Sequence, residues 1–403
     1  MIKHIITGMA ALKLSVLHWH MIDEQSYPIQ GDRVPELARE TAFAPAAVYT
    51  PQDMREVVHF ARARGVRVMP EVETPGHGTS RSKVFPQLNL STCPDVLNPT
   101  INATYEFLVK CLSDVAPQFT EPVLFLGGDE VSASCYDSDP RVRRWMTANC
   151  EQLRCCGNVT SCSAQMLSYF FSRVATDVMP KLPVRRSMGV WLADHGFPRY
   201  PADDVIPGIN ALPPDTLWMP YQNLQTAKQS LAANRDTVVT PAFGNVGSIK
   251  AEWAGKGGWY LDMKPNFDDA WKLDLCRDLE CDAHPGWRER LLGGAACAWG
   301  DAFSGRVSSI DQDLFSGGLA AIAERLWSDP RCGTGQAPAC DIAAADAKNR
   351  SHALACHWSL WGMPTFDRAP CADWPCSTPG GSLELTPVVM PFTCASSWSV
   401  VPE

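Results

Sequence analysis

Short apolar runs alternate with longer amphipathic stretches along most of this chain. Seven apolar runs predict strands, at residues 14–19, 66–71, 123–127, 187–191, 216–219, 237–240 and 293–299. The stretches between them predict helices, among them residues 103–115 and residues 51–64, which open with Pro51 and Asp53 in the first turn. Strands that alternate with helices in this way are typical of a parallel β/α fold.

The ends of the apolar runs predict where a functional site lies. We expect a (β/α)8 TIM barrel, in which the active site forms at the C-terminal ends of the strands. The residues at or just after the apolar runs are strongly polar or aromatic: His20, Asp23, Glu73, His77, Asp129, Glu130, Trp191, Trp218, Trp299 and Asp301. The sequence therefore places its candidate chemistry at one end of the predicted barrel.

Both ends of the chain differ from this pattern. Residues 1–366 predict the barrel, whereas residues 367–403 are rich in Pro, Ser, Thr and Cys, and we interpret them as a disulfide-tied C-terminal tail. The first 20 residues predict an amphipathic helix that leads into a strand. We reject a signal peptide there, because Lys13 interrupts the apolar run and no small-residue cleavage site precedes His18.

Charge and cysteine content favour a secreted or lysosomal protein. The net charge of -9, without a run of Lys or Arg, argues against a nucleic-acid partner and suits an acidic compartment. The 16 cysteines are spread along the chain, as is typical of disulfides formed in an oxidising compartment. No apolar run reaches the roughly 18 residues of a membrane span. Four Asn-X-Ser/Thr sequons predict glycosylated surface loops, at Asn89, Asn102, Asn158 and Asn349.

The segment LFLGGDEV, residues 124–131, is the sharpest local feature. An apolar strand runs through two glycines into the adjacent carboxylates Asp129 and Glu130. Two carboxylates in one water-poor pocket do not both ionise easily, so we expect one of them to stay protonated near neutrality and to act as a general acid. The alternative is a loop with two solvated acids.

Histidines near two strand ends add further candidates. His77 follows a Pro-Gly turn in EVETPGHG, where an imidazole tunes the pKa and orientation of a neighbouring acid, and the alternative is a structural loop histidine. The segment HWHMIDEQ brings His18, His20 and Asp23 close together, but no third nitrogen or thiolate ligand follows at zinc spacing. We therefore predict no metal site.

Four tryptophans end or follow apolar runs: Trp191, Trp218, Trp259 and Trp299. Aromatic faces stack on the C–H faces of sugars, while polar groups at the rim bind the hydroxyls. Core packing is the alternative for any one of them. Four at the same end of different strands favour a sugar-binding pocket.

Seven segments together resemble the catalytic domain of the family 20 glycoside hydrolases, the lysosomal and chitin-degrading β-hexosaminidases. They are KLSVLHWHMIDEQSYP, YTPQDMREVVHFARARGVRVMPEVETPGHG, LNPTINATYEFL, FLGGDEVSASCYDSDP, GGWYLD, GGAACAWGD and AERLW, and they stand in the family's order between residue 4 and about residue 366. The resemblance implies hydrolysis of terminal non-reducing N-acetylhexosamine residues from β-N-acetylhexosaminides, with no metal or organic cofactor.

The resemblance also implies a retaining, substrate-assisted mechanism. The 2-acetamido carbonyl of the substrate would attack the anomeric carbon and form an oxazolinium intermediate. Glu130, which we expect to be a buried acid, would protonate the leaving oxygen and then activate water. Asp129 would hold the acetamido N–H, and the Tyr260 hydroxyl would bond the attacking carbonyl oxygen. Asp23 and His77 would support the acid through a hydrogen-bonded relay. The remaining implied substrate contacts are aromatic walls and ligands of sugar hydroxyls: Trp191, Trp218, Trp259, Trp299, Asp262 and Asp301.

Two disulfides and the partners follow from the same resemblance. A bond from Cys93 to Cys135 would clip two neighbouring active-site loops, and one from Cys356 to Cys371 would tie the last helix to the tail. The expected partner is a glycan with N-acetylglucosamine or N-acetylgalactosamine at its non-reducing end. The family often forms dimers, which makes a homodimer a candidate assembly.

The chain departs from the family's pattern in three places. The family's first barrel strand carries an arginine that grips the sugar hydroxyls, and this chain begins after it, so we expect an incomplete barrel with its first strand absent, from an incomplete sequence. Glu73 stands where the family usually has Asp, within reach of His77 but with a changed relay geometry. Ala295 stands where Glu is common.

Two other functions compete with the hydrolase. A catalytically inactive, sugar-binding relative would keep the pocket without turnover, and the absent arginine favours it. A retaining hydrolase with an ordinary carboxylate nucleophile would not require the acetamido group. A plain β-glucoside distinguishes the two mechanisms, because a hydrolase with a carboxylate nucleophile can cleave it and the substrate-assisted route cannot.

Overall fold

The computed structural model describes residues 1–157, 159–192, 212–221, 224–240, 245–246, 249–250, 267–271, 273–299, 317–327 and 347–351. The chain divides into two compact units, Met1–Phe366 and Asp367–Glu403. The predicted tail lies outside the described residues, so the fold below is that of the first unit. None of the helices in the described ranges has the length and apolar character needed to cross a membrane.

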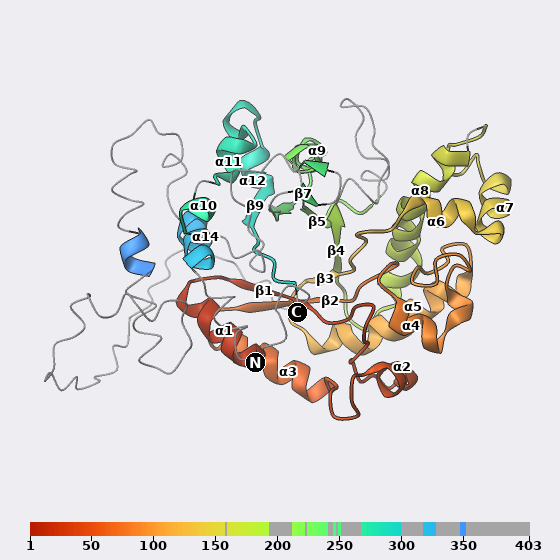
Figure 1. Cartoon of the computed structure of the whole chain (residues 1–403), viewed down its shortest axis with the longest axis horizontal. Coiled ribbons are helices and arrows are strands. Elements are labelled where there is room, and N and C mark those ends of the chain that lie inside the picture. The colour runs from red at the N-terminus through yellow and green to blue at the C-terminus, as the bar shows by residue number, and fades with distance from the viewer. Residues whose placement is uncertain are drawn as a thin grey trace, which may run out of the picture. The chain divides into compact units, whose positions relative to one another are not determined.

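Seven parallel strands form one sheet in the order of the sequence (Figure 1). They are β1 (Val16–His20), β2 (Arg67–Glu71), β3 (Val123–Phe125), β4 (Ser187–Leu192), β5 (Leu217–Pro220), β6 (Thr237–Val239) and β9 (Leu291–Gly294). All seven predicted strands are therefore confirmed, six of them within two residues at each end, whereas β9 ends five residues before the predicted run does. Helices lie between most of the strands, and the fold is an incomplete (β/α)8 TIM barrel, as predicted. Among the described residues, β1 and β9 form its two edges.

The remaining elements connect or cover these strands. A separate antiparallel pair consists of β7 (Asn245–Val246) and β8 (Ile249–Lys250). The α-helices are α1 (Ile2–Ala11), α2 (Pro35–Thr41), α3 (Pro51–Arg62), α4 (Thr79–Val84), α5 (Asn102–Val115), α6 (Ala133–Ser138), α7 (Pro140–Ala148), α8 (Val159–Arg173), α9 (Leu224–Ala232), α10 (Phe267–Trp271), α11 (Leu275–Asp278), α12 (Trp287–Arg290) and α14 (Gly317–Trp327). Shorter turns are η1 (Pro86–Leu88), η2 (Ala116–Gln118), η3 (Val174–Val178), η4 (Met179–Lys181) and η7 (Cys281–Ala283).

Helix α3 shows how the sequence specifies these elements. Thr50 and Asp53 form a reciprocal capping box at its start, with Pro51 in the first turn, which satisfies backbone N–H groups that have no partner inside the helix. Its buried side chains recur at helical spacing: Met54, Val57, Val58 and Ala61. This apolar face packs against the sheet beside α1, and Figure 1 shows the two helices next to β1 and β2.

The sheet has a helix-covered outer face and a barrel-facing inner face, because successive side chains of a strand point to opposite sides. A large buried cluster joins the outer face to helices α1 to α8. A smaller cluster fills the inner face: Met69, Phe125, Trp191, Leu217, Met219 and Tyr221. This inner cluster lies directly below the C-terminal ends of the strands, where the candidate site forms.

Candidate active site

The chain leaves β3 through a sharp turn that presents Asp129 and Glu130. Gly127 and Gly128 have φ of +73° and +100°, and a Cβ on Gly127 would lie 2.0 Å from the Glu73 carboxylate oxygens. Only glycine fits such a backbone at such close approach. Glu130 itself has φ of +56°, a conformation that costs a side-chain-bearing residue free energy and that gathers at functional sites.

His77 faces Glu130 from the loop after β2. Its Nε2 lies 3.4 Å from Glu130 Oε2, and its own φ of +46° is also in the left-handed region. Burial alone lowers the pKa of His77, but the hydrogen bond to Glu130 and the nearby negative charges of Asp129 and Asp23 raise it to about 9. The two residues therefore meet as an imidazolium and a carboxyl group across neighbouring strand ends.

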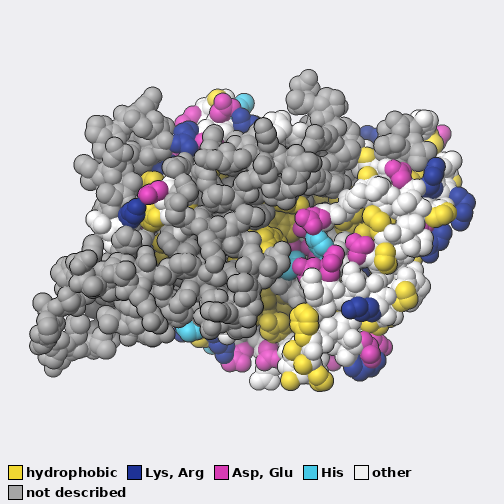
Figure 2. Space-filling view, in the orientation of Figure 1, with side chains coloured by type: hydrophobic (Ala, Val, Ile, Leu, Met, Phe, Trp, Pro, Cys, Tyr) yellow, Lys and Arg dark blue, Asp and Glu magenta, His cyan; other side chains and the backbone are white. Residues whose placement is uncertain are grey.

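The buried acid of this carboxyl pair is placed differently from our prediction. The side chain of Glu130 is 58% exposed, so the prediction of a buried acid at this position is wrong. The pKa of Asp129 is raised to about 6, because burial and the Glu71 charge raise it more than His77 lowers it. The turn through Gly127 and Gly128 sends the first carboxyl inward and the second outward. Figure 2 shows acidic and histidine side chains gathered beside hydrophobic ones near the middle of the view.

Asp23 bonds a histidine other than the one we predicted. Its Oδ2 lies 3.2 Å from His20 Nε2, and its Oδ1 accepts a hydrogen bond from the Glu24 backbone N–H. Burial raises the pKa of Asp23, but these hydrogen bonds and the charges of His20 and His77 lower it below its ordinary value. Asp23 and His77 thus interact through their charges, and His20 replaces His77 as the direct partner in the predicted relay.

Trp191 and Trp299 lie together beside these carboxylates. Their ring centroids are 6.3 Å apart, and Tyr221 lies edge-on to Trp191 at 5.8 Å. We call Trp191, Tyr221 and Trp299 the aromatic wall. The Trp191 N–H donates to Glu71 Oε1 at 2.7 Å, and Trp299 lies edge-on to His20 at 5.6 Å.

Trp218 lies on the other face of the sheet, which corrects our prediction for it. In the register of β4 and β5, Trp191 pairs with Met219 and Val190 pairs with Trp218. Side chains that pair in register share a face, so Trp218 points into the helix-covered core, where it is 1% exposed. Sequence reasoning missed Tyr221. Tyr221 follows Met219 by two residues, so it shares the inner face of the sheet, but only the structure shows which face that is.

Several predicted residues lie outside the described residues. They are Trp259, Tyr260, Asp262, Asp301, Cys356, Cys371 and Asn158. The predicted disulfide joins Cys93, in the connection between β2 and β3, to Cys135 in α6, in the connection after β3. Three further disulfides that the sequence did not predict are Cys150–Cys156, Cys155–Cys162 and Cys276–Cys281.

The sequons differ in their exposure. Asn102 and Asn349 are exposed. Asn89 is 1% exposed and its Nδ2 donates to the Phe85 carbonyl at 3.0 Å, so the predicted surface glycan at Asn89 is wrong for this fold.

A buried glutamate lies beneath the turn after β3. Glu73 accepts a hydrogen bond from Gly128 N at 3.1 Å, and burial together with the charges of Asp129 and Glu71 raises its pKa well above the ordinary value. Its oxygens lie within 4.8 Å of ligand atoms of His20 and Glu71 on one side and of His77 and Asp129 on the other. Carboxylates and imidazoles of this kind can bind cations. Among the described residues, however, Glu73 already accepts a hydrogen bond from the Gly128 N–H, and Glu71 already accepts one from the Trp191 N–H.

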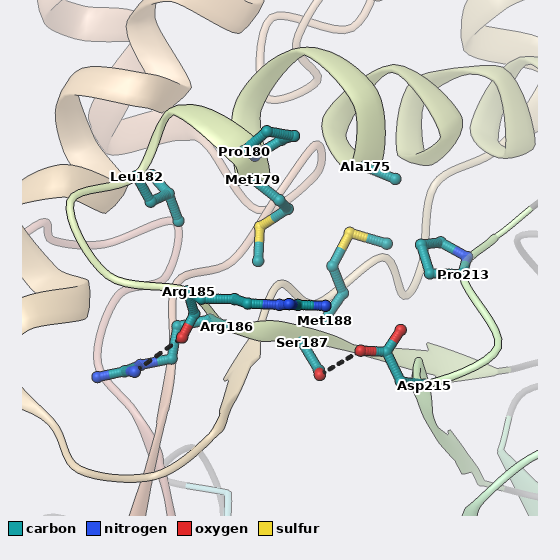
Figure 3. A pocket seen from close by; sticks show the side chains of 10 residues that line it. All are labelled: Ala175, Met179, Pro180, Leu182, Arg185, Arg186, Ser187, Met188, Pro213 and Asp215. Atoms are coloured by element: carbon teal, nitrogen blue, oxygen red, sulfur yellow. Dashed lines mark hydrogen bonds between the residues drawn. The ribbon is translucent and has the colours of Figure 1, made fainter. Parts of the chain in front are cut away.

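A hollow of about 440 Å³ lies at the opposite end of β4 (Figure 3). Met179, Met188 and Pro213 line its apolar side, and Ser187 donates to Asp215 at 2.6 Å at its edge. None of the predicted site residues lines it. The strand ends near Glu130 and this hollow are therefore separate features of the sheet.

Comparison with known proteins agrees with this geometry. The human beta-hexosaminidase subunit beta is 29% identical over 331 residues, which are 80% of this chain and 53% of that protein, and the pig subunit beta is 30% identical over 335 residues, with 80% and 55% covered. The chain spans about half the length of these curated relatives. Two solved structures share the fold. A Flavobacterium johnsoniae chitobiase has a TM-score of 0.67 at 19% identity, with 88% of this chain and 49% of that chain covered.

The second is a Vibrio harveyi exo beta-N-acetylglucosaminidase in complex with N-acetylglucosamine, with a TM-score of 0.67 at 20% identity and with 90% of this chain and 56% of that chain covered. The model of the glycosyl hydrolase family 20 catalytic domain matches residues 1–330. The chain therefore belongs to glycosyl hydrolase family 20 and carries its catalytic domain.

Proposed function

We propose that this protein removes terminal non-reducing N-acetylhexosamine residues from β-N-acetylhexosaminides by retaining, substrate-assisted catalysis. The observation that carries the proposal is the meeting of Glu130 and His77 at 3.4 Å, beside Asp129 and the aromatic wall. Two carboxyl groups of different exposure, one imidazole and a wall of aromatic rings are the parts that this reaction requires. Family membership supports the same reaction.

Glu130 acts as the general acid and then as the general base. Its exposed side chain, next to the His77 imidazolium, is placed to meet the glycosidic oxygen of a bound sugar. The first proton goes from Glu130 to the leaving oxygen, and Glu130 later takes a proton from the water that attacks the intermediate. His77 is a positioning residue, because its positive charge holds the carboxyl group in place through both steps.

Asp129 acts on the acetamido group. The acetamido oxygen attacks the anomeric carbon, and the nitrogen gains positive charge as the oxazolinium ring forms. An ionised Asp129, which is already partly removed from water, offsets that charge more strongly than a solvated carboxylate does. With a pKa of about 6, Asp129 is ionised in the neutral range and gains its proton as the medium becomes acidic. The methyl end of the acetamido group then packs on the aromatic wall.

The decisive experiment compares two substrates that differ only in this group. We expect an aryl N-acetyl-β-glucosaminide to be hydrolysed and the matching aryl β-glucoside to remain intact, with the released sugar first appearing as the β-anomer in NMR spectra. Equal cleavage of both substrates would favour a carboxylate nucleophile instead. Binding of N-acetylglucosamine without cleavage of either substrate would favour an inactive sugar-binding protein.

The disulfides support the proposal of a secreted or lysosomal location, because such bonds persist in oxidising compartments.

We propose a glycan ending in N-acetylglucosamine or N-acetylgalactosamine as the substrate and a homodimer as the candidate assembly.

A further inference from the structure

Glu71 is a buried carboxylate beneath the aromatic wall that the proposed reaction does not use. It is the last residue of β2 and only 1% exposed. Its Oε1 accepts the Trp191 N–H at 2.7 Å, a hydrogen bond between two buried side chains. A hydrogen bond to a charged acceptor fixes its donor more firmly than one between neutral groups. The tilt of the Trp191 ring is thereby tied to Glu71.

The other oxygen of Glu71 faces two histidines of β1. Its Oε2 lies 3.0 Å from His18 Nε2 and 2.9 Å from His20 Nδ1. The strand register sets this contact, because His20 pairs with Glu71 and their side chains therefore share a face. The His18 ring in turn stacks on Trp191, with centroids 5.3 Å apart and an angle of 17°. Glu71 thus joins a ring of the aromatic wall to both histidines.

The charges around Glu71 distinguish it from Glu73. Burial raises the pKa of Glu71, but the charges and hydrogen bonds of His20 and His18 hold it well below the ordinary value. Burial lowers the pKa of His20, but Glu71 and Asp23 raise it to about 10. The pKa of Glu73 moves in the opposite direction, well above its ordinary value. Glu71 therefore stays ionised and His20 stays charged throughout the range from pH 5 to pH 8.

We infer that Glu71 is a positioning residue, which fixes the Trp191 ring through one oxygen and keeps His20 in place through the other. The inference rests on the proposed function, because the ring of Trp191 matters to hydrolysis only if the acetamido group packs on it. Through His20 the same carboxylate reaches Asp23, which makes a continuous chain from β4 through β2 and β1 to the loop after β1.

The first test reads the structure of this chain without any substrate. In Glu71→Gln the charge beside His20 is removed while the size of the side chain is kept. We expect the pKa of His20, followed by NMR of its imidazole and assigned with a His20→Gln variant, to fall below its value in the wild type, because Glu71 is the group that raises it most. The N–H resonance of Trp191, assigned with Trp191→Phe, should shift in the same variant. The matched control is Glu121→Gln, which neutralises a buried glutamate just before β3, at the other end of the sheet.

The second test is kinetic and separates positioning from chemistry. Loss of a charged hydrogen bond to Trp191 should raise KM for an aryl N-acetyl-β-glucosaminide by about tenfold in Glu71→Gln, with a smaller change in kcat. The alkaline limb of kcat/KM should also move to lower pH, because His20 loses its proton earlier. Combining Glu71→Gln with Trp191→Phe should raise KM by less than the product of the two single effects, since both variants break the same bond.

The outcomes separate this inference from the proposed function. If the wild-type protein hydrolyses the substrate but His20, Trp191 and KM are the same in Glu71→Gln as in the wild type, the inference is overturned. If the wild type hydrolyses nothing, the proposed function fails, and the NMR comparison alone decides the role of Glu71. Should Glu71→Gln not fold, Trp191→Phe and His20→Gln replace it, each removing one partner of the carboxylate. An unchanged KM and pH profile in both would then overturn the inference.

Discussion

The two ends of the parallel sheet differ in how many buried carboxyl groups they bring together. At the N-terminal end, Glu121 is paired with Arg67 at 3.2 Å, and Arg186 donates to the backbone carbonyls of Ala116 and Phe119. Each charge there has a polar partner, although burial still raises the pKa of Glu121 and lowers that of Arg186. At the C-terminal end several buried carboxyl groups lie together: burial and the charges of Asp129 and Glu71 raise the pKa of Glu73, and burial and the charge of Glu71 raise that of Asp129.

This difference shows that the fold buries carboxyl groups, at a cost in free energy, at the C-terminal ends of the strands. A sheet stabilised only by packing has no need to bury several carboxylates together. Two residues with side chains, His77 and Glu130, also adopt positive φ at this end. Lys13 and Asn234 adopt positive φ before β1 and β6, at the N-terminal end. The C-terminal end is distinguished by the combination of strained backbone with several buried carboxyl groups in contact, which is typical of a site selected for chemistry.

The largest effect that we expect comes from Glu130→Gln, at the C-terminal end. Loss of the general acid should lower kcat for an aryl N-acetyl-β-glucosaminide by about 10²- to 10⁴-fold. The loss should shrink for leaving groups that depart without a proton. The exposed Glu151→Gln is the matched control, with an unchanged rate. A Glu130→Gln protein that keeps the wild-type rate would remove Glu130 from the mechanism.

The disulfide between the loops after β2 and β3 gives the next effect. Cys93 and Cys135 are 42 residues apart, so replacing both with Ser should lower the free energy of unfolding by about 4 kcal/mol, because the unfolded chain gains freedom. Replacing Cys150 and Cys156, which are 6 residues apart, should cost less, about 2 kcal/mol. Denaturant unfolding measures both. Equal losses would show that loop entropy is not the cause.

Asp129→Asn tests whether the buried charge of Asp129 lowers the free energy of unfolding. The folded-state pKa of Asp129 is raised to about 6, so the stability that this group contributes is present below the unfolded-state pKa and is lost as the pH rises through 6. Removing the charge should therefore stabilise the protein at pH 7, by about 2 kcal/mol, and make little difference at pH 4. Urea unfolding at both pH values checks this. Destabilisation at pH 7 would show that the ionised carboxylate is well paired.

The smallest effect belongs to the N-terminal end. Glu121→Gln replaces one partner of a pair whose arginine is 61% exposed, and burial already disfavours the charge of Glu121, so the free energy of unfolding should change by about 1 kcal/mol or less, with kcat and KM unchanged. Thermal unfolding and the same aryl substrate measure the two quantities. A large loss of activity in this variant would erase the distinction between the two ends.

Much of the fold could be predicted from the sequence, because strand length and helix caps are local. The apolar runs located all seven strands, and the capping pattern located α3. The faces of buried strands could not be predicted, since both sides of a barrel strand are apolar and the alternation carries no signal. Trp218 was assigned to the wrong face for this reason.

From the sequence we could predict which residues lie at the strand ends, but not their exposure or their hydrogen-bond partners. Asp129, Glu130 and His77 follow strands, and the barrel brings strand ends together whatever the details. The exposure of Glu130 depends on the backbone angles of two glycines, and the partner of Asp23 depends on the register of β1 against β2. Neither is a local property of the sequence, so both emerged only from the structure.

The most direct test of this account is a crystal structure of the protein with a thiazoline analogue of N-acetylglucosamine, whose fused ring mimics the oxazolinium intermediate. The account predicts that its ring nitrogen lies within hydrogen-bond distance of Asp129, its methyl group packs on Trp191, and the Glu130 carboxyl group faces the anomeric carbon. An analogue bound elsewhere, or bound with Asp129 turned away from the nitrogen, would contradict it.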